Sequence, residues 1–224
     1  MIKAIIFDAY GTIISTGNGS INAARKILEI NNRTDIPAEE FYARWKKIHR
    51  MHIDELFEFI CEEKIFQADL EKLYTEYGLI RDAQKDVAIM LESLTGRVAF
   101  PESRQVLNKL SDHFVTCIGS TSDTVPLLYN LKKNQLIVHR IFTSESLGVY
   151  KPKADFYTGI LKELGTDASD ALFVGDSLLD DIWGPQQIGI KTCWVNRNGA
   201  KYENIKPDFQ VNNLTAIINI LGLD

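Results

Sequence analysis

Short apolar runs alternate with longer amphipathic stretches over most of this 224-residue sequence. Each run has the length of one buried strand, and the stretches carry apolar residues at helical spacing. The pattern predicts strands at 4–7, 114–118, 140–143, 171–174, 191–195 and 209–211, helices at 102–110, 124–133, 154–164 and 182–188, and a surface loop at 201–206. Strands that alternate with helices predict βαβ units, and hence a mostly parallel sheet with helices on both faces.

Residues 15–97 follow a different pattern, with no convincing strand and with apolar residues at helical spacing. These residues form three groups: Phe41, Trp45 and Ile48, then Leu56, Phe57 and Ile60, then Val87, Met90, Leu91 and Leu94. Several consecutive helices inserted after the first strand predict a separate subdomain. We therefore expect a core formed by 1–14 and 98–224 and a helical insertion at 15–97, with Phe41 and Trp45 in its interior and with His49 and His52 on a solvated helix face.

The composition is that of an ordinary soluble protein, with 45% hydrophobic and 25% charged residues. A net charge of −5 without basic clusters argues against nucleic-acid binding. No apolar run approaches the roughly 20 residues of a membrane span, and the N-terminus lacks a signal-peptide pattern. The cysteines Cys61, Cys117 and Cys193 are too scattered for a disulfide framework or a zinc site, and the last two should be small buried side chains. We expect a cytoplasmic protein with a small-molecule substrate and without a membrane partner; the sequence does not indicate its oligomeric state.

Polar side chains follow four of the predicted strands. Asp8 comes directly after the first strand, and Gly11 allows the backbone to turn sharply beneath it. The later strands lead into a hydroxyl cluster at 120–122, a lysine at 151 and an acidic loop at 175–181. Because the carboxyl ends of parallel strands meet at the edge of the sheet where ligands bind, we expect these groups to gather around one site.

Together these motifs resemble the haloacid dehalogenase superfamily, and the resemblance covers the whole chain. Residues 7–12 are similar to its first motif, Ser120 with Thr121 to its second, Lys151-Pro152 to its third, and Gly175-Asp176 with Asp180-Asp181 to its fourth. The resemblance implies a Rossmann-like, doubly wound α/β core with an α-helical cap inserted after the first motif. Most members are magnesium-dependent phosphatases or phosphomutases, and a minority are dehalogenases or phosphonatases.

The resemblance also implies a role for individual residues. Asp8 would be the nucleophile that forms an aspartyl-phosphate, and Lys151 would balance its charge. Ser120 is expected to act with it in the catalytic site, and the residues expected to bind phosphate or substrate are Thr12, Thr121 and the cap residue Lys46. Mg²⁺ would take oxygen ligands from Asp8, the main-chain carbonyl of Tyr10 and Asp176, supported by Asp180 or Asp181. Asp181 fits the commoner phosphatase spacing and Asp180 fits dehalogenase relatives, so spacing leaves this choice open.

Position 10 departs from the phosphatase pattern. Phosphatases of the family carry a second aspartate there as general acid and base, whereas this chain has Tyr10, a possible proton donor but a poor base. The Asp-Ala-Tyr-Gly-Thr form resembles that of the L-2-haloacid dehalogenases, which need no metal. Gly175-Asp176-Ser177 instead retains the metal-ligating carboxylate of the phosphatases. We favour a Mg²⁺-dependent phosphatase of a small phosphorylated metabolite, with a metal-independent 2-haloacid dehalogenase and a catalytically weak binding protein as the alternatives.

Overall fold

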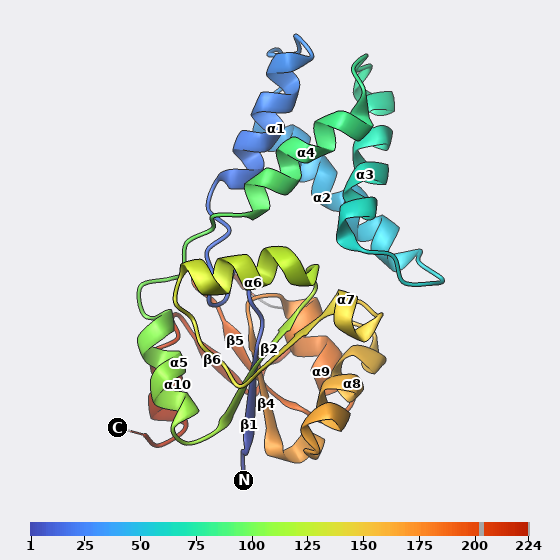
Figure 1. Ribbon diagram of the computed structural model, residues 1–224. Coiled ribbons are helices and arrows are strands. Elements are labelled where there is room, and N and C mark those ends of the chain that lie inside the picture. The colour runs from blue at the N-terminus through green and yellow to red at the C-terminus, as the bar shows by residue number, and fades with distance from the viewer. Residues whose placement is uncertain (202–203, 224) are drawn as a thin grey trace. The chain divides into compact units, whose positions relative to one another are not determined.

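The computed structural model describes residues 1–201 and 204–223 (Figure 1). The chain forms two compact units, one made of Met1–Ser15 with Val98–Asp224 and the other of Thr16–Arg97. We call the first the core unit and the second the helical unit. The surface loop predicted at 201–206 includes positions 202 and 203, which lie outside the described residues.

The core unit is built on a parallel sheet with the strand order β3-β2-β1-β4-β5-β6. The strands are β1 (Ala4–Phe7), β2 (Val115–Ser120), β3 (Arg140–Thr143), β4 (Ala171–Gly175), β5 (Lys191–Val195) and β6 (Phe209–Val211). The bounds predicted for the first, third, fifth and sixth strands are confirmed, and the second and fourth extend further toward their carboxyl ends. Every residue of β1 is buried, as expected of a strand covered on both faces.

Helices cover both faces of this sheet, and successive side chains of a strand pack against opposite faces. The helical elements of the core unit are α5 (Ser103–Ser111), α6 (Thr124–Lys133), α7 (Ser144–Leu147), α8 (Ala154–Leu164), the short 3₁₀ turn η1 (Ala168–Asp170), the π-type turn η2 (Leu178–Trp183), α9 (Gly184–Gln186) and α10 (Ala216–Ile220). Ile5 and Phe7 pack in one apolar cluster with residues of α5, α6 and α10, whereas Ile6 packs in another with residues of α8. The helix predicted at 182–188 is wrong in its start, because η2 already begins at Leu178.

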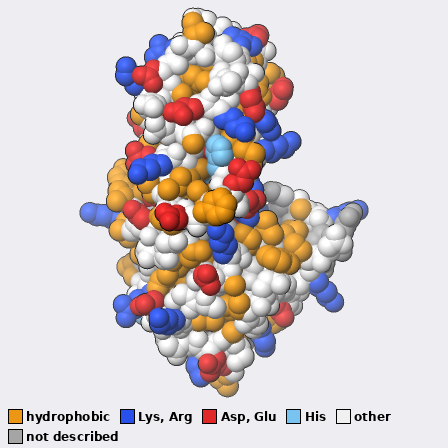
Figure 2. All heavy atoms as spheres, turned by 90° about the vertical axis from the view of Figure 1, so that its right-hand side faces the viewer, with side chains coloured by type: hydrophobic (Ala, Val, Ile, Leu, Met, Phe, Trp, Pro, Cys, Tyr) orange, Lys and Arg blue, Asp and Glu red, His pale blue; other side chains and the backbone are white. Residues whose placement is uncertain are grey.

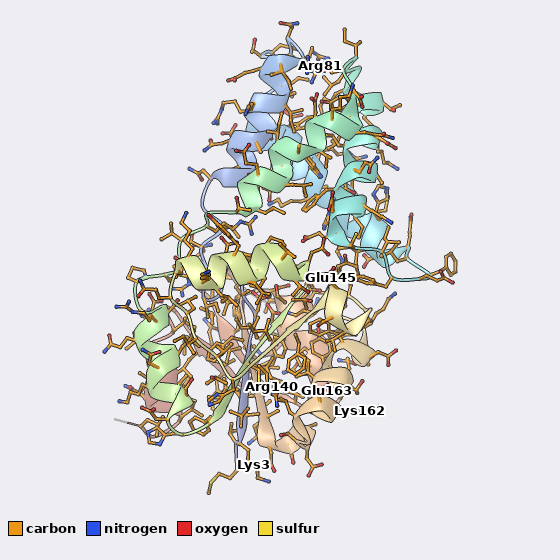
Figure 3. All side chains as sticks on the ribbon, in the orientation of Figure 1. Lys3, Arg81, Arg140, Glu145, Lys162 and Glu163 are labelled. Atoms are coloured by element: carbon orange, nitrogen blue, oxygen red, sulfur yellow. The ribbon has the colours of Figure 1, made fainter. Side chains whose placement is uncertain are left out.

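The strand order reverses between β1 and β4, since β2 and β3 lie on one side of this pair and β5 and β6 on the other. Ligands of open parallel sheets bind at the carboxyl ends of the strands where such a reversal occurs. Here those ends lead into Asp8 and Asp176. Lys3 and Arg140 lie at the amino ends of β1 and β3, so these two cations belong to the opposite edge of the sheet (Figure 3).

The helical unit consists of α1 (Gly19–Ile30), α2 (Ala38–Asp54), α3 (Glu62–Tyr77) and α4 (Ala83–Leu94). Phe41 and Trp45 are buried in its apolar core, as predicted. The helical interpretation of Leu56, Phe57 and Ile60 is wrong: they lie between α2 and α3, and the Phe57 side chain is fully exposed. Their spacing fits a helix, but so short a segment does not recover the cost of helix nucleation.

The surface charges, the helix lengths and the cysteines can each be compared with what the sequence predicts. On the face that Figure 2 shows, basic side chains are interspersed with acidic ones. None of the helices in the described part of the chain is long and apolar enough to cross a membrane. Cys117 and Cys193 are buried free thiols, as predicted.

Candidate active site

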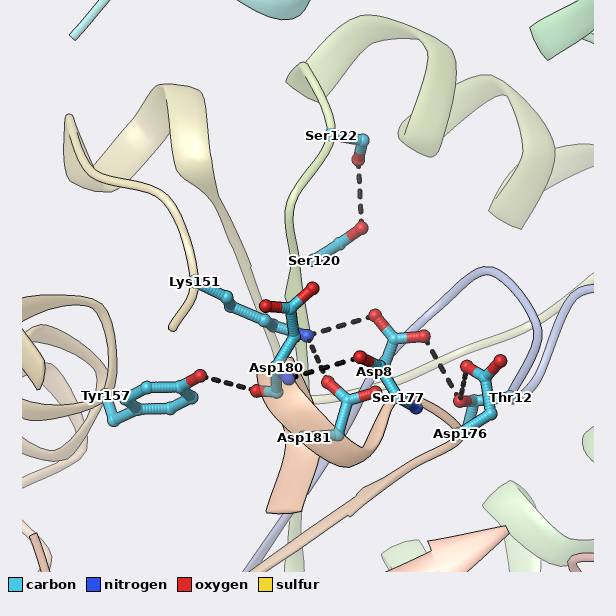
Figure 4. Close-up of polar contacts among 10 residues, drawn as sticks. All are labelled: Asp8, Thr12, Ser120, Ser122, Lys151, Tyr157, Asp176, Ser177, Asp180 and Asp181. Atoms are coloured by element: carbon cyan, nitrogen blue, oxygen red, sulfur yellow. Dashed lines mark hydrogen bonds and ion pairs between the residues drawn. The ribbon is translucent and has the colours of Figure 1, made fainter. Parts of the chain in front are cut away.

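Three carboxylates meet where the strand order reverses. Each of Asp8, Asp176 and Asp181 contributes an oxygen, and these oxygens lie within 4.8 Å of one another. Asp8 follows β1, Asp176 follows β4, and Asp181 belongs to η2. Figure 4 shows the three side chains converging from these elements. The reversal of strand order therefore gathers acids that are far apart in the sequence.

Lys151 provides the positive charge in this cluster. Its Nζ lies 3.0 Å from Asp8 Oδ1 and 2.8 Å from Asp181 Oδ1, and its side chain is buried. Burial alone lowers the pKa of a lysine, but the charges of Asp181 and Asp8 outweigh it, so the pKa of Lys151 is above its ordinary value. Lys151 is thus a permanent cation, and it balances one carboxylate of the three.

The remaining negative charge falls on the two acids of the acidic loop. Burial and then repulsion by Asp8 raise the pKa of Asp176 to about 6. Asp176 is partly accessible to solvent, and water screens part of this repulsion. Burial also raises the pKa of Asp181 well above its ordinary value, although Lys151 acts in the opposite direction. A further cation at this place would relieve the repulsion.

Thr12 links two of the carboxylates, and glycines make room for them. The Thr12 hydroxyl lies 3.1 Å from Asp8 Oδ2 and 3.1 Å from Asp176 Oδ1. A Cβ on Gly11 would stand 2.4 Å from the Asp176 carboxylate, and one on Gly175 would stand 2.2 Å from that of Asp181. Gly11 also has a φ of 98°, which favours glycine. The glycines of the first and fourth motifs are therefore what allow the acids to approach.

The structure separates the two neighbouring aspartates of η2. Asp181 contacts Lys151 through one oxygen, and its other oxygen accepts a hydrogen bond from the Ser177 amide at 2.9 Å. Asp180 uses its main chain instead: its amide donates to Ser177 Oγ at 3.1 Å, and its carbonyl accepts from the Tyr157 hydroxyl. Among the described residues, the carboxylate cluster includes Asp181 and not Asp180. The geometry favours Asp181, which corresponds to the phosphatase spacing.

The hydroxyl groups predicted for the site lie at the end of β2 and after β1. Ser120 Oγ is 3.0 Å from Ser122 Oγ, and both side chains are buried (Figure 4). Thr121 stands between these serines in the sequence and is half-buried. Tyr10 accepts a hydrogen bond from Nδ2 of Asn130 on α6 at 2.9 Å. The Tyr10 hydroxyl is therefore hydrogen-bonded to a residue of α6, a helix to which none of the three carboxylates belongs.

Comparison with known proteins gives the family. A model described as haloacid dehalogenase-like hydrolase matches residues 2–189. This chain is a member of the haloacid dehalogenase family of hydrolases. The match confirms the resemblance drawn from the four motifs, the Rossmann-like α/β fold and the class of enzyme.

Relatives of this hydrolase include both phosphatases and dehalogenases. The chain is 22% identical to the glyceraldehyde 3-phosphate phosphatase of Methanopyrus kandleri, over 99% of its own length and 97% of that protein. It is 23% identical to (S)-2-haloacid dehalogenase 4A of Burkholderia cepacia, over 99% and 95% of the two lengths. The structure of the HAD-hydrolase YfnB from Bacillus subtilis, bound to magnesium, matches with a TM-score of 0.80 at 22% identity and 98% coverage of both chains.

The remaining residue predicted for the site of this hydrolase lies in the helical unit. Lys46 is exposed on α2, and its Nζ is 5.3 Å from the centroid of the Tyr42 ring. The neighbouring Arg44 pairs with Glu76 at 2.6 Å. The assignment of Lys46 to phosphate or substrate binding stays a prediction.

The histidines of the helical unit do not form the solvated helix face that the sequence predicts. His49 Nδ1 lies 2.7 Å from Asp69 Oδ2, and His52 Nδ1 lies 2.6 Å from Asp69 Oδ1. Trp45 Nε1 donates to Asp69 Oδ2 at 3.1 Å, and the Asp69 side chain is fully buried. Asp69 stands four residues after Ile65, on the apolar stripe of α3. An acid on an apolar stripe is the sequence signal that could have revealed this contact.

Two residues beside the carboxylates are not among the site residues that the sequence predicts, although their segment resembles both phosphatases and dehalogenases of the family. Trp194 Nε1 donates to the main-chain carbonyl of Asp176 at 2.9 Å, and Arg197 Nη2 donates to the Thr12 carbonyl at 3.0 Å. Trp194 pairs with Gly175 across β4 and β5, and Arg197 follows β5. Their position at the carboxyl end of a predicted strand was the available signal.

Proposed function

We propose that this hydrolase is a Mg²⁺-dependent phosphatase that acts on a small phosphorylated metabolite through an aspartyl-phosphate on Asp8. The observation that carries the proposal is the cluster of Asp8, Asp176 and Asp181 around a single lysine. Three carboxylates and one lysine leave a net negative charge. Phosphate monoesters are anions, so a site that binds them needs more positive charge than Lys151 supplies.

The donor set fits Mg²⁺, which prefers carboxylate and carbonyl oxygens. Asp8, Asp176 and the main-chain carbonyl of Tyr10 would hold the ion, and Asp181 would support it. Bound there, Mg²⁺ would supply the charge that neutralises a transferring phosphoryl group. The magnesium-bound structure of YfnB supports this assignment by similarity.

The side chains around Asp8 prepare it as a nucleophile. Lys151 holds Oδ1 and Thr12 holds Oδ2, so the plane of the Asp8 carboxylate is fixed before a substrate arrives. In the first step an Asp8 oxygen forms a bond to phosphorus while the bond from phosphorus to the leaving alcohol breaks. Water then hydrolyses the aspartyl-phosphate and releases inorganic phosphate. The hydroxyl of Ser120 or Thr121 would donate a hydrogen bond to a phosphoryl oxygen.

Tyr10 sets an expectation for the range of substrates. Its hydroxyl is engaged by Asn130, and the position lacks the carboxylate that could activate water. General acid–base catalysis contributes about 10²–10⁴-fold, so esters with poor leaving groups should react slowly. An activated ester such as p-nitrophenyl phosphate needs less assistance and is the better first substrate.

Dehalogenation of a 2-haloacid is the second candidate. Tyr10 and the relative named (S)-2-haloacid dehalogenase 4A favour it. Asp8 would then displace halide from carbon and form an ester that water hydrolyses, without a metal. Without a metal, Asp8, Asp176 and Asp181 would have to share the positive charge of Lys151.

The deciding experiment measures phosphate release from p-nitrophenyl phosphate and halide release from 2-chloropropionate, each with Mg²⁺ and with EDTA. We expect phosphate release that disappears in EDTA, returns with added Mg²⁺ and is lost in Asp8→Asn. Asp112→Asn, the same change at an exposed residue that follows α5, is the matched control and should keep the activity.

Halide release that is unaffected by EDTA, without phosphate release, would overturn the proposal in favour of the dehalogenase. Absence of both activities would favour a catalytically weak binding protein.

The helical unit is inferred to serve as the cap that selects the substrate. We also infer a cytoplasmic location, which suits the free thiols of Cys117 and Cys193.

A further inference from the structure

Arg197 lies two residues beyond β5, at the carboxyl edge of the sheet of the core unit. Its guanidinium reaches three groups at once. Nη2 donates to the Thr12 carbonyl at 3.0 Å, and Nη1 pairs with Glu102 Oε1 at 2.8 Å. Its central carbon lies 3.5 Å from the centroid of the Phe100 ring. A planar fork with stacking on an aromatic ring is specific to arginine, since lysine offers a single point charge.

The Thr12 carbonyl is part of the turn that carries the nucleophile. Within this turn the Gly11 amide donates to the Ile14 carbonyl, and the amides of Ile13 and Ile14 donate to the Ala9 carbonyl. Arg197 holds the Thr12 carbonyl from outside the turn. The hydroxyl of the same threonine lies between Asp8 and Asp176. One residue is thus fixed through its main chain by Arg197 and contacts two carboxylates through its side chain.

Phe100, on which Arg197 stacks, is itself tied to this turn, as is Ser103 at the start of α5. The Phe100 amide and the Ser103 hydroxyl both donate to the Ile13 carbonyl, at 3.1 Å and 2.7 Å. Burial raises and Arg197 lowers the pKa of Glu102, and the net direction is below its ordinary value, so Glu102 is ionised and paired. The segment before α5 and the guanidinium together enclose the main chain of residues 12 and 13.

We propose that Arg197 is a positioning residue for the reaction on Asp8. Arg197 does not contact Asp8, Asp176, Asp181 or Lys151 directly. It fixes the position of the Thr12 main chain, and the Thr12 hydroxyl in turn fixes the spacing between Asp8 and Asp176. The effect on catalysis rests on the proposed function, whereas the effect on the turn does not. Misplacement of a reacting group by an ångström costs about 10²-fold, and loss of an outer hydrogen-bonding partner of a metal site costs about 10–100-fold.

The test compares Arg197→Lys and Arg197→Met with the wild type and with Arg104→Met, an exposed arginine of α5 whose guanidinium donates to Gln135. Amide hydrogen exchange of residues 11–14 reports the turn, and exchange of β2 reports the rest of the sheet. In Arg197→Met we expect exchange in the turn to rise at least about tenfold while β2 is unchanged. With p-nitrophenyl phosphate and Mg²⁺, kcat should fall by about 10–100-fold and KM should change little.

Arg197→Lys should restore part of the lost kcat, because one donor can still reach the Thr12 carbonyl. Unchanged exchange in the turn would overturn the proposal, and so would exchange that rises equally in β2, which indicates general loss of stability. If the wild type releases no phosphate, the proposed function fails, and the exchange of residues 11–14 still decides the role of Arg197.

Discussion

The helical unit and the core unit both bury acids, but only the helical unit balances that charge with its own side chains. In the helical unit Asp69 is a single carboxylate, and ring nitrogens of Trp45, His49 and His52 contact its two oxygens. In the core unit three carboxylates share one lysine, Lys151. The first arrangement is complete, whereas the second is short of positive charge.

This difference separates a structural acid from a functional one. Burying a charge is costly unless partners compensate it, and Asp69 has such partners on a neighbouring helix. In the core cluster a single lysine serves three carboxylates, and burial together with the repulsion among them raises the pKa of Asp176 and of Asp181. Groups with a shifted pKa are common at functional sites, because a bound ligand can supply the charge that the protein lacks there. Burial of an acid is therefore a weaker sign of function than the imbalance around it.

The largest expected effect comes from removing one acid of the unbalanced cluster. Asp181→Asn should lower kcat/KM for p-nitrophenyl phosphate by at least about 10²-fold, because Lys151 loses its closest partner and the cluster loses a charge that supports Mg²⁺. Asp180→Asn should change kcat/KM by roughly twofold or less, since its hydrogen bonds to Ser177 and Tyr157 use the main chain. Steady-state kinetics with saturating Mg²⁺ measures both. Equal losses in the two variants would contradict the assignment of the acidic loop.

The second prediction breaks the balanced site. Asp69→Asn should lower the free energy of unfolding by about 3 kcal/mol, because an amide replaces the buried, charged acceptor of one buried donor, Trp45, and two partly buried donors, His49 and His52. Asp54→Asn, on the exposed side of α2, removes only a surface pair with Arg50 and should cost less than about 1 kcal/mol. Urea unfolding followed by circular dichroism gives both values. A loss in Asp69→Asn no larger than in Asp54→Asn would show that the three donors contribute little.

The same comparison explains what the sequence could and could not predict. The strands were found because parallel strands are continuous apolar runs, and Asp8 and Asp176 were found because they follow such runs. The sequence left open whether Asp180 or Asp181 joins the carboxylate cluster. The answer depends on the wide π-type turn η2, which apolar periodicity does not predict. Asp69 was not predicted, because it lies inside a helix and does not follow a strand.

Two further outcomes show the limit of periodicity itself. Leu56, Phe57 and Ile60 have helical spacing and yet lie outside any helix, because spacing over a few residues carries little information. Arg197 contacts Thr12 from 185 positions further along the chain. A contact of that kind follows from the order of the strands, which alternating patterns alone do not give.

The third prediction reduces the imbalance in the core. Asp176→Asn should stabilise the metal-free protein by about 1 kcal/mol, since it removes repulsion with Asp8 that solvent partly screens. The melting temperature should rise by roughly 2–4 °C for a chain of this length. Mg²⁺ should raise the melting temperature of the wild type and not that of the variant, because a ligand of the ion is lost. A metal-free variant that melts below the wild type would contradict the excess of negative charge.

The smallest effect is a pH dependence confined to the balanced site. Burial lowers the pKa of His49, but the hydrogen bond to Asp69 and the charges of Glu62 and Asp69 outweigh it, with Arg50 opposing, so the pKa is raised. The imidazolium stacks on the Phe66 ring, 4.6 Å between centroids. A raised pKa means that its contribution to stability is complete below the unfolded value of about 6.5 and is lost as the pH rises through the folded value.

We therefore expect the free energy of unfolding to decline from about pH 6.5 upward in the wild type and to decline less in His49→Gln. His113→Gln, at an exposed position of the core unit, should follow the wild type. Urea unfolding at a series of pH values gives the free energy of unfolding. Hydrogen exchange in α2 and α3 at the same pH values assigns the change to the helical unit. Parallel curves for the wild type and His49→Gln would mean that Asp69 is satisfied without a charged His49. The carboxylate would then be held by hydrogen bonds alone, and the contrast with the core cluster would be one of hydrogen bonding rather than of charge.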